Sequence, residues 1–251
     1  MNLSALPKLL TLLLSITWLS CAGIAHAANP PTAFQVSYNI EKYNNIVGVM
    51  QLSLQQQDDR FIYTSKTEPK GLLDLFSDDK VFEQSILQWD AEHQQLRLLE
   101  YQFKRSEKPN DNQHFTMTWN NADSALCSGI YRKQPFTLTL ESPAWDQLSV
   151  QLALMTDLSS NDNQVKSYRY DIIDSANLSD YKFLLETEQT IKIGQQEYRT
   201  LKLKRPHESG KRTTYLWLAP ELGYIPVRVE QFRKGKLHFS MELAEPAKVT
   251  P

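Results

Sequence analysis

The chain has 251 residues and is close to electrically neutral, with 27 Lys and Arg residues against 29 Asp and Glu residues and a formal net charge of −2 at pH 7. This balance gives no electrostatic case for binding nucleic acid, which is normally accompanied by a basic face. A chain of this length can form one large β domain with a packed core.

The first residues have the pattern of a cleaved signal peptide. Lys8 precedes an apolar run over residues 9–19, and Ala25-His26-Ala27 then supplies the small residues that a signal peptidase recognises. The apolar run is shorter than the roughly 20 residues that a membrane-spanning helix needs. We therefore expect cleavage between Ala27 and Ala28 and a soluble protein of the bacterial periplasm.

The expected organisation is a signal peptide over residues 1–27 and a single β-rich domain over residues 28–251, with no transmembrane segment in the mature chain. A lipid-modified Cys21 is the alternative, although Trp18 stands where that modification prefers Leu. Cys127 is then the remaining cysteine, so stability in an oxidising compartment has to come from a packed core. We expect Cys127 to be a small, semi-buried residue near a turn; an exposed thiol would permit a disulfide-linked dimer.

Alternation of apolar and polar residues dominates the rest of the chain. It is clear in "FQVSYNI" (34–40), "FTMTW" (115–119), "FTLTL" (136–140) and "KLHFSMEL" (236–243). One buried and one wet face is typical of antiparallel strands. The sequence therefore predicts a mainly antiparallel all-β fold: a single curved sheet or an incompletely closed β-barrel with one or two short covering helices.

Two segments interrupt the alternation. Residues 144–158, "AWDQLSVQLALMTDL", have apolar residues at helical spacing, and Asp146 is placed to cap the N-terminus of the helix. Residues 69–79, "PKGLLDLFSDD", are expected to form a short buried helix or an exposed apolar flap. Both segments are candidate lids over the core of an open sheet.

A proline-bounded hairpin is predicted over residues 213–232. Pro220 ends one apolar strand, Gly223 allows the chain to reverse, and Pro226 begins the next strand. Proline cannot donate a ladder hydrogen bond, so this hairpin is expected beside a free edge or at a bulged margin. Gly194 and Gly235 mark two further tight turns.

The segments "SPAWDQLSVQLALM", "IKIGQQEYRTLKLK" and "TTYLWLAPELGYIPVRVEQFRKGKLHFSMEL" resemble the domain-of-unknown-function 3108 family of exported bacterial proteins. The carriers of the resemblance are W-L-x-P followed by a Pro-Val-Arg strand, and Asp146, Leu148 and Ser149 at the start of the helix. The resemblance implies a periplasmic β protein with no established activity. The terminal hairpin is also distantly similar to that of Lol-type lipoprotein carriers, whose half-open barrels hold acyl chains under helical lids.

No catalytic or metal-binding pattern is evident. His93, His114, His207 and His238 are not at metal-ligand spacing from one another, and no cofactor motif is present. Ser77-Asp78-Asp79-Lys80 fits S-x-x-K, but the companion motifs of that chemistry are missing. We expect no metal, no cofactor and no catalytic constellation.

The leading hypothesis is therefore a non-catalytic binding or carrier module for an apolar or lipid-like ligand. The alternatives are an envelope protein-interaction or assembly module that acts through a sheet edge, and a hydrolase, which the missing nucleophile–base pair opposes. Aromatic residues on the inner face could line a pocket or simply fill the barrel. The candidate pocket and lid residues are Leu72, Leu73, Leu75, Phe76, Leu148, Leu152, Met155, Tyr215 and Trp217.

Overall fold

The computed structural model describes residues 29–71, 79–160, 165–207 and 209–249. The N-terminal half of the sheet contains β1 (Phe34–Lys42), β2 (Asn45–Gln57), β3 (Arg60–Pro69), β4 (Val81–Asp90), β5 (Gln95–Arg105), β6 (Gln113–Trp119), β7 (Ala125–Tyr131) and β8 (Gln134–Leu140). The rest of the chain contributes β9 (Ala144–Trp145), β10 (Ser167–Asp174), β11 (Asn177–Ile193), β12 (Gln196–Pro206), β13 (Arg212–Ala219), β14 (Ile225–Arg233), β15 (Lys236–Leu243) and β16 (Lys248–Val249). The helical elements among the described residues are α1 (Val150–Ser160) and the 3₁₀ turns η2 (Pro109–Asp111) and η3 (Pro220–Leu222).

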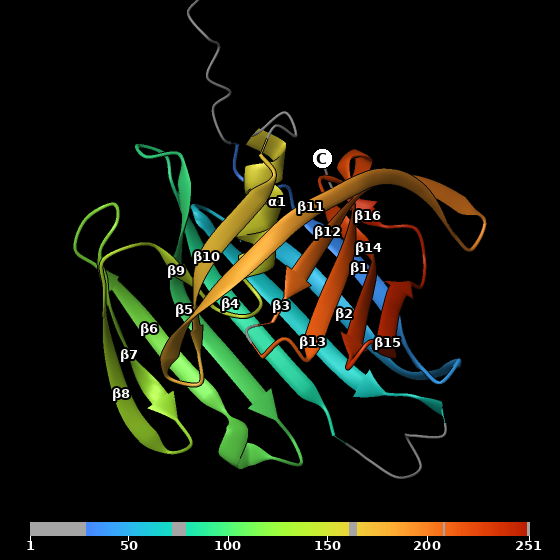
Figure 1. The fold of residues 1–251 in the computed structure, drawn as a ribbon. Coiled ribbons are helices and arrows are strands. Elements are labelled where there is room, and N and C mark those ends of the chain that lie inside the picture. The colour runs from blue at the N-terminus through green and yellow to red at the C-terminus, as the bar shows by residue number, and fades with distance from the viewer. Residues whose placement is uncertain (1–28, 72–78, 161–164, 208, 250–251) are drawn as a thin grey trace, which may run out of the picture.

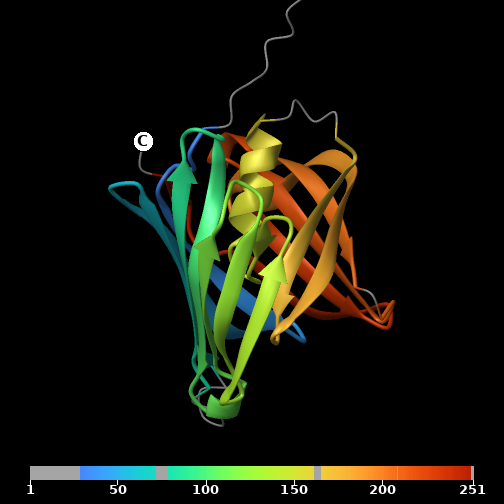
Figure 2. The same ribbon diagram turned by 90° about the vertical axis from the view of Figure 1, so that its left-hand side faces the viewer.

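The described strands form a single sheet in the order β8-β7-β6-β5-β4-β3-β2-β1-β15-β14-β13-β12-β11-β10-β9, with β16 also paired to β1. Every pairing is antiparallel except the short parallel contact between β9 and β10. The sheet curls into a nearly closed barrel whose two ends, β8 and β9, are not hydrogen-bonded to each other (Figures 1 and 2). The predicted incompletely closed antiparallel barrel is confirmed.

Alternation along the strands places one face of the sheet in the barrel core. A continuous inner row is set by the registers of β1 to β6, in which Phe34, Leu54, Tyr63, Ser85, Tyr101 and Phe115 are cross-strand partners and all are buried. Aromatic pairs such as Tyr101 and Phe115, with ring centroids 5.4 Å apart, fill the barrel. Many of the aromatic side chains on the strands are therefore part of the barrel core.

Helix α1 lies inside the opening of the barrel, between the strands of its two halves (Figure 2). Leu152, Leu154 and Leu158 are fully buried, which accounts for a helix that is apolar on nearly all sides. The regular helix begins at Val150, four residues after the cap that was predicted at Asp146. Ala144 and Trp145 instead pair with β10, and residues 147–149 form a turn before Val150.

Asp146 organises the start of this helix. Its Oδ1 accepts hydrogen bonds from the backbone N–H groups of Leu148 and Ser149, both at 2.7 Å, and from the hydroxyl of Ser85 on β4 at 2.9 Å. The Ser149 hydroxyl donates to Oδ2 at 2.7 Å. The side chain is completely buried, so a single carboxylate both satisfies the free amides of the helix and ties the helix to the sheet.

The proline-bounded hairpin does not lie at a free edge, contrary to one of the two predicted placements. β13 and β14 lie in the interior of the sheet, between β12 and β15. The other predicted placement, at a bulge, is confirmed. The register of β13 and β14 shifts between Trp217 and Leu218, and Leu218 is the partner of Pro226. Gly223 follows η3 with a left-handed φ of 65°, and the Tyr38 hydroxyl donates 2.8 Å to the Pro226 carbonyl, which fixes the bulge to β1.

The tight turns and the helices of the described residues can also be compared with the predictions. The predicted turns at Gly194 and Gly235 are tight hairpins with positive φ angles of 58° and 73°. No helix among the described residues is long and apolar enough to span a membrane.

Candidate functional site: a cavity at the open seam

A cavity of about 690 Å³ opens beside the seam between β8 and β9. It is lined by the β4–β5 turn, the linker that follows β8, strand β9, helix α1, and strands β10 and β11. Its apolar lining residues are Leu96, Pro143, Trp145 and Ala153. The polar lining residues are Gln94, Gln95, Ser142, Thr156, Asp157, Arg169, Tyr170, Asp171 and Asp180.

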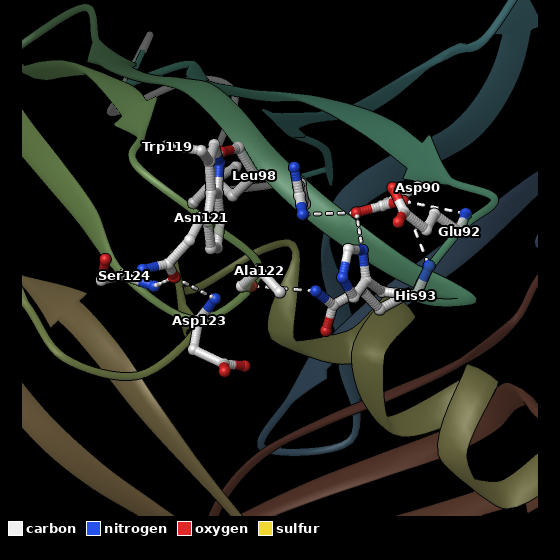
Figure 3. A network of polar contacts seen from close by, with 11 residues as sticks. Asp90, Glu92, His93, Leu98, Trp119, Asn121, Ala122, Asp123 and Ser124 are labelled. Carbon is white, nitrogen blue, oxygen red and sulfur yellow. Dashed lines mark hydrogen bonds and ion pairs between the residues drawn. The ribbon is translucent and has the colours of Figure 1, made fainter.

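The β4–β5 turn is held in place by the polar network drawn in Figure 3. Asp90 accepts hydrogen bonds from the backbone of Glu92 and His93, from the His93 ring at 2.8 Å, and forms an ion pair with Arg97. Burial alone would raise the pKa of Asp90, but the hydrogen bonds from His93 and the charge of Arg97 lower it below its ordinary value. The turn therefore carries a fixed carboxylate at its base.

A second set of contacts in Figure 3 joins this turn to the β6–β7 turn. The Gln95 side chain donates 2.9 Å to the carbonyl of Ala122, and the Trp119 indole N–H donates 2.8 Å to the carbonyl of Leu98. Within the β6–β7 turn, the Asn121 side chain accepts the backbone N–H groups of Asp123 and Ser124 at 2.8 Å. This wall of the cavity is preformed.

The opposite wall joins α1 to β10. The Tyr170 hydroxyl donates 2.6 Å to Oδ2 of Asp157, and the Tyr170 ring packs edge-on against Phe183 with centroids 6.0 Å apart. Burial raises the pKa of Asp157, an effect that the hydrogen bond from Tyr170 opposes. Burial, together with the charge of Asp157, raises the pKa of Tyr170.

Thr156, the residue before Asp157 in α1, has a polar group without a hydrogen-bond partner among the described residues. This group, the Oγ1 atom, is buried. Thr156 lines both the seam cavity and a smaller cavity of about 230 Å³ that continues toward Phe34, Met155 and Ile225. A buried hydroxyl without a partner costs free energy that a bound polar group would recover.

The mouth of the cavity is polar and carries more acid than base. Arg169 forms an ion pair with Asp180 at 2.9 Å, and the Ser142 hydroxyl donates 2.7 Å to Asp171. Asp157 adds a further carboxylate deeper in the cavity. The arrangement can hold a molecule with an apolar body and a polar group that donates hydrogen bonds or carries positive charge.

A different polar cluster lies inside the barrel below the start of α1. Burial, followed by the charge of Asp146, raises the pKa of Glu83 to about 7, while a 3.1 Å hydrogen bond from Tyr101 opposes the shift. Burial also raises the pKa of Asp146 to about 6, against the hydrogen bonds from Ser149, Ser85 and Leu148. Two acids with raised pKa values thus share the interior next to the helix cap.

The residues that the sequence offered as possible catalytic or metal-binding groups do not form a site among the described residues. Cys127 is fully buried, and burial raises the pKa of its thiol to about 12. Among the described residues, no group of three His, Cys, Asp or Glu side chains could hold a metal ion. Ser77, Asp78 and the lid residues Leu72, Leu73, Leu75 and Phe76 lie outside the described residues.

The remaining pocket candidates fall into two separate places. Leu148, Leu152 and Met155 are buried in the barrel core, and Met155 also reaches the smaller cavity. Tyr215 and Trp217, by contrast, are on the outer face of the sheet, where Trp217 is buried and Tyr215 is half-buried. Their neighbours Leu216 and Leu218 face the core, and alternation turns Tyr215 and Trp217 away from it.

The outer aromatic residues line a groove of their own, with a volume of about 440 Å³. Tyr215 lies between Trp217 and Phe232, with centroid distances of 6.3 Å and 5.7 Å. The ammonium group of Lys202 lies 4.4 Å from the centroid of Tyr215. The structure therefore separates these two aromatic residues from α1, with which the sequence had grouped them.

Several seam residues were missed by sequence reasoning. Trp145 was read as part of the helix, and Tyr170 and Arg169 stand on an ordinary alternating strand. Asp157 did carry a signal, because it is an isolated acid in an otherwise apolar buried helix. Only the curl of the sheet brings these residues together from β9, α1 and β10.

The comparisons with known proteins identify the family. Residues 33–242 match the model of the family described as "Protein of unknown function (DUF3108)". The chain belongs to the DUF3108 family. The predicted resemblance is thus confirmed over most of the chain, whereas the distant likeness to Lol-type carriers stays a prediction. No curated protein matches the sequence.

Two crystal structures are similar to this DUF3108 protein at low sequence identity. One is of an exported-protein candidate with a YmcC-like fold from Bacteroides fragilis NCTC 9343, with 10% identity, a TM-score of 0.31 and coverage of 89% of this chain and 99% of that one. The other is of a lipoprotein candidate from Parabacteroides distasonis ATCC 8503, with 12% identity, a TM-score of 0.33 and coverage of 87% and 96%. At these TM-scores neither structure indicates a function for this chain.

Proposed function

We propose that this DUF3108 protein is an exported, non-catalytic binding module that holds an amphipathic, lipid-like molecule in the seam cavity. The observation that carries the proposal is the cavity itself, which combines an apolar surface at Leu96, Trp145 and Ala153 with a polar mouth. Its volume of about 690 Å³ is within the range of small-molecule sites. Export to the periplasm is supported by the signal-peptide pattern that ends at Ala27.

The position of the ligand differs from the one that the sequence suggested. The space between α1 and the sheet is filled by Leu152, Leu154 and Leu158, so α1 is part of the core and not a lid over an empty barrel. The ligand would lie beside the helix, with its apolar part against Trp145 and its polar group near Asp157 and Thr156. The raised pKa of Asp157 and its hydrogen bond with Tyr170 favour a ligand that donates hydrogen bonds at this point.

The first test is native mass spectrometry of the protein purified gently from periplasm, followed by solvent extraction and lipid analysis. We expect a stoichiometric adduct that leaves with the solvent. Ser142→Trp, which adds a bulky side chain at the exposed mouth, should abolish the adduct and the uptake of an apolar fluorescent dye. Ser128→Trp on the outside of β7 is the matched control and should leave both unchanged.

A bare mass for the wild-type protein together with no dye uptake would refute the proposal. Equal dye uptake by Ser142→Trp and Ser128→Trp would show that binding occurs elsewhere on the molecule. The same spectrum gives the mass of the mature chain, and a start at Ala28 would establish the processing site. A lipid mass carried by Cys21 would establish the lipoprotein alternative instead.

A second candidate function is supported by the open edge of β8. Residues 134–140 pair with β7 on one side, and no described strand pairs with the other side. Such an edge can receive an extended segment of a partner protein. A photo-crosslinking residue at exposed Thr137 or Thr139 should then capture a specific periplasmic protein; crosslinks no more specific than those from Thr118 on β6 would exclude this function.

A further inference from the structure

The hairpins of this barrel alternate strictly between its two ends. Because neighbouring strands outside the β9–β10 contact are antiparallel, the turns β1–β2, β12–β13 and β14–β15 all lie at the same end. The strands that they join are adjacent in the sheet, in the order β2-β1-β15-β14-β13-β12. We refer to residues 41–46, 209–212 and 233–237 together as the hairpin face, which lies toward the lower end of the barrel in Figure 1.

The hairpin face is basic. Its exposed cationic residues are Lys211, Arg212, Arg233, Lys234 and Lys236. None of the five forms an ion pair with a carboxylate among the described residues. Glu41 is the one acidic residue in the three stretches that define the face. Several unpaired cations on adjacent turns make a strongly positive local surface.

The same face exposes large apolar side chains. Tyr43 is 84% exposed, Leu237 is 51% exposed and Ile46 is 40% exposed. The ammonium group of Lys42 lies 5.4 Å from the centroid of the Tyr43 ring. Isolated exposed apolar residues are ordinary, but here Tyr43 and Ile46 on the β1–β2 hairpin lie beside the β14–β15 hairpin, which carries Leu237 and three of the five cations. Aromatic and aliphatic groups interleaved with Lys and Arg are typical of surfaces that enter a membrane interface.

The opposite end of the barrel has the reverse charge. The β2–β3 turn carries Asp58 and Asp59, the β4–β5 turn carries Asp90 and Glu92, and η3 carries Glu221. The molecule is therefore polarised along the barrel, although its net charge of −2 is small. An anionic surface would attract one end and repel the other, so it would orient the protein as well as bind it.

We propose that the hairpin face docks on the surface of an anionic phospholipid bilayer. Lys211, Arg212, Arg233, Lys234 and Lys236 lie next to the lipid phosphates, and Tyr43, Ile46 and Leu237 enter the interfacial layer. The lines of support are charge complementarity and the coincidence of cations with exposed apolar groups. This inference goes beyond the proposed ligand site, because the seam cavity is lined from the β4–β5 turn and lies away from these hairpins. The two proposals can fail separately.

The test is co-flotation of the purified mature protein with vesicles of phosphatidylcholine alone or of phosphatidylcholine with phosphatidylglycerol. We expect flotation only with the phosphatidylglycerol vesicles, and release when the salt is raised from 0.05 M to 0.5 M, because salt screens exposed charges. Removing one positive charge should weaken binding by about fivefold. Lys211→Glu/Lys236→Glu removes two positive charges and adds two negative ones, so its loss of affinity should be larger than that from removing two charges alone. Lys166→Glu/Lys192→Glu at the other end makes the same change in net charge and should leave binding unchanged.

A second pair of variants tests the apolar part. Leu237→Ser should weaken binding to the same vesicles without changing its salt dependence, whereas Leu126→Ser, which is 40% exposed on β7 near the opposite end, should have no effect. Thermal unfolding by circular dichroism confirms that each variant is folded. Equal flotation with both kinds of vesicle, an equal loss in the two Lys double variants, or no flotation of the wild type would overturn the proposal. The dye-uptake result for the cavity does not depend on any of these outcomes.

Discussion

At the scale of single residues, the most unusual feature is the pair of acids inside the barrel. Asp146 is fully buried yet accepts four hydrogen bonds, so its charge is solvated by the helix amides and two hydroxyls. Glu83 has one such bond, from Tyr101, and burial and the neighbouring carboxylate raise its pKa to about 7. The cap residue was visible in the sequence, because Asp is a preferred N-cap residue and Asp146 precedes apolar residues at helical spacing. Glu83 was not visible as its neighbour, since β4 and residue 146 are distant in the chain.

The raised pKa of Glu83 makes stability depend on pH in a defined direction. Between the ordinary value of 4.5 and about 7 the folded protein binds more protons at this site than the unfolded chain does. The free energy of unfolding should therefore fall as the pH rises through this window, by on the order of 2 kcal/mol, and then level off. Glu83→Gln should reduce this slope, leaving the part that the raised pKa of Asp146 contributes up to about pH 6, and it should be more stable than the wild type at pH 8.

Denaturant unfolding at pH 5 and pH 8 measures the effect. The exposed Glu245→Gln is the control, because it makes the same chemical change outside the barrel. A wild-type slope retained in Glu83→Gln would show that Glu83 does not titrate in this window.

At the scale of elements, α1 is the part whose role the sequence left undecided. Its apolar residues fitted both a movable lid and a core helix. The structure shows Leu152 and Leu154, which lie on roughly opposite sides of the helix, both fully buried together with Leu158. The helix is held by Asp146 at one end and by the hydrogen bond between Asp157 and Tyr170 farther along. The parallel pairing of Ala144 and Trp145 with β10 could not be read from the sequence, because two residues carry no detectable periodicity.

If α1 is core, removing one of its buried side chains should be costly. Leu152→Ala should lower the free energy of unfolding by about 2–5 kcal/mol, as is usual for a fully buried leucine. Leu178→Ala, at a residue that is 47% exposed, should change it by about 0.5 kcal/mol or less. Guanidinium unfolding curves compare the two. A loss below about 1 kcal/mol for Leu152→Ala would support a loosely attached lid.

At the scale of the whole molecule, two properties arise from the curled sheet: the unsealed seam and the polarity of charge. The seam exists because β8 and β9 are not paired, and it brings the β4–β5 turn, α1 and β10 around one cavity. The polarity exists because alternate hairpins fall at opposite ends. Neither property is visible in the composition, which shows only a net charge of −2.

The seam also predicts how backbone stability is distributed. Within the part of the chain that the structure describes, β8 is paired with a strand on one side only, whereas β1 is paired to β2 on one side and to β15 and β16 on the other. Hydrogen–deuterium exchange measured by mass spectrometry should therefore be at least tenfold faster in peptides from 134–140 than in peptides from 34–42. Equal protection of the two strands would mean that the seam is closed in solution.

The sequence by itself determined the strand-rich antiparallel class, the family and most of the tight turns. These depend on local rules: alternation along the strand, the φ angles that Gly194, Gly223 and Gly235 permit, and the bulge that Pro226 requires. Only the tertiary structure decided that the proline-bounded hairpin lies inside the sheet, that Tyr215 and Trp217 face outward, and that Trp145, Asp157 and Tyr170 meet at one cavity. The physical reason is that register and curl set these contacts between strands far apart in the chain, and no local pattern of residues encodes them.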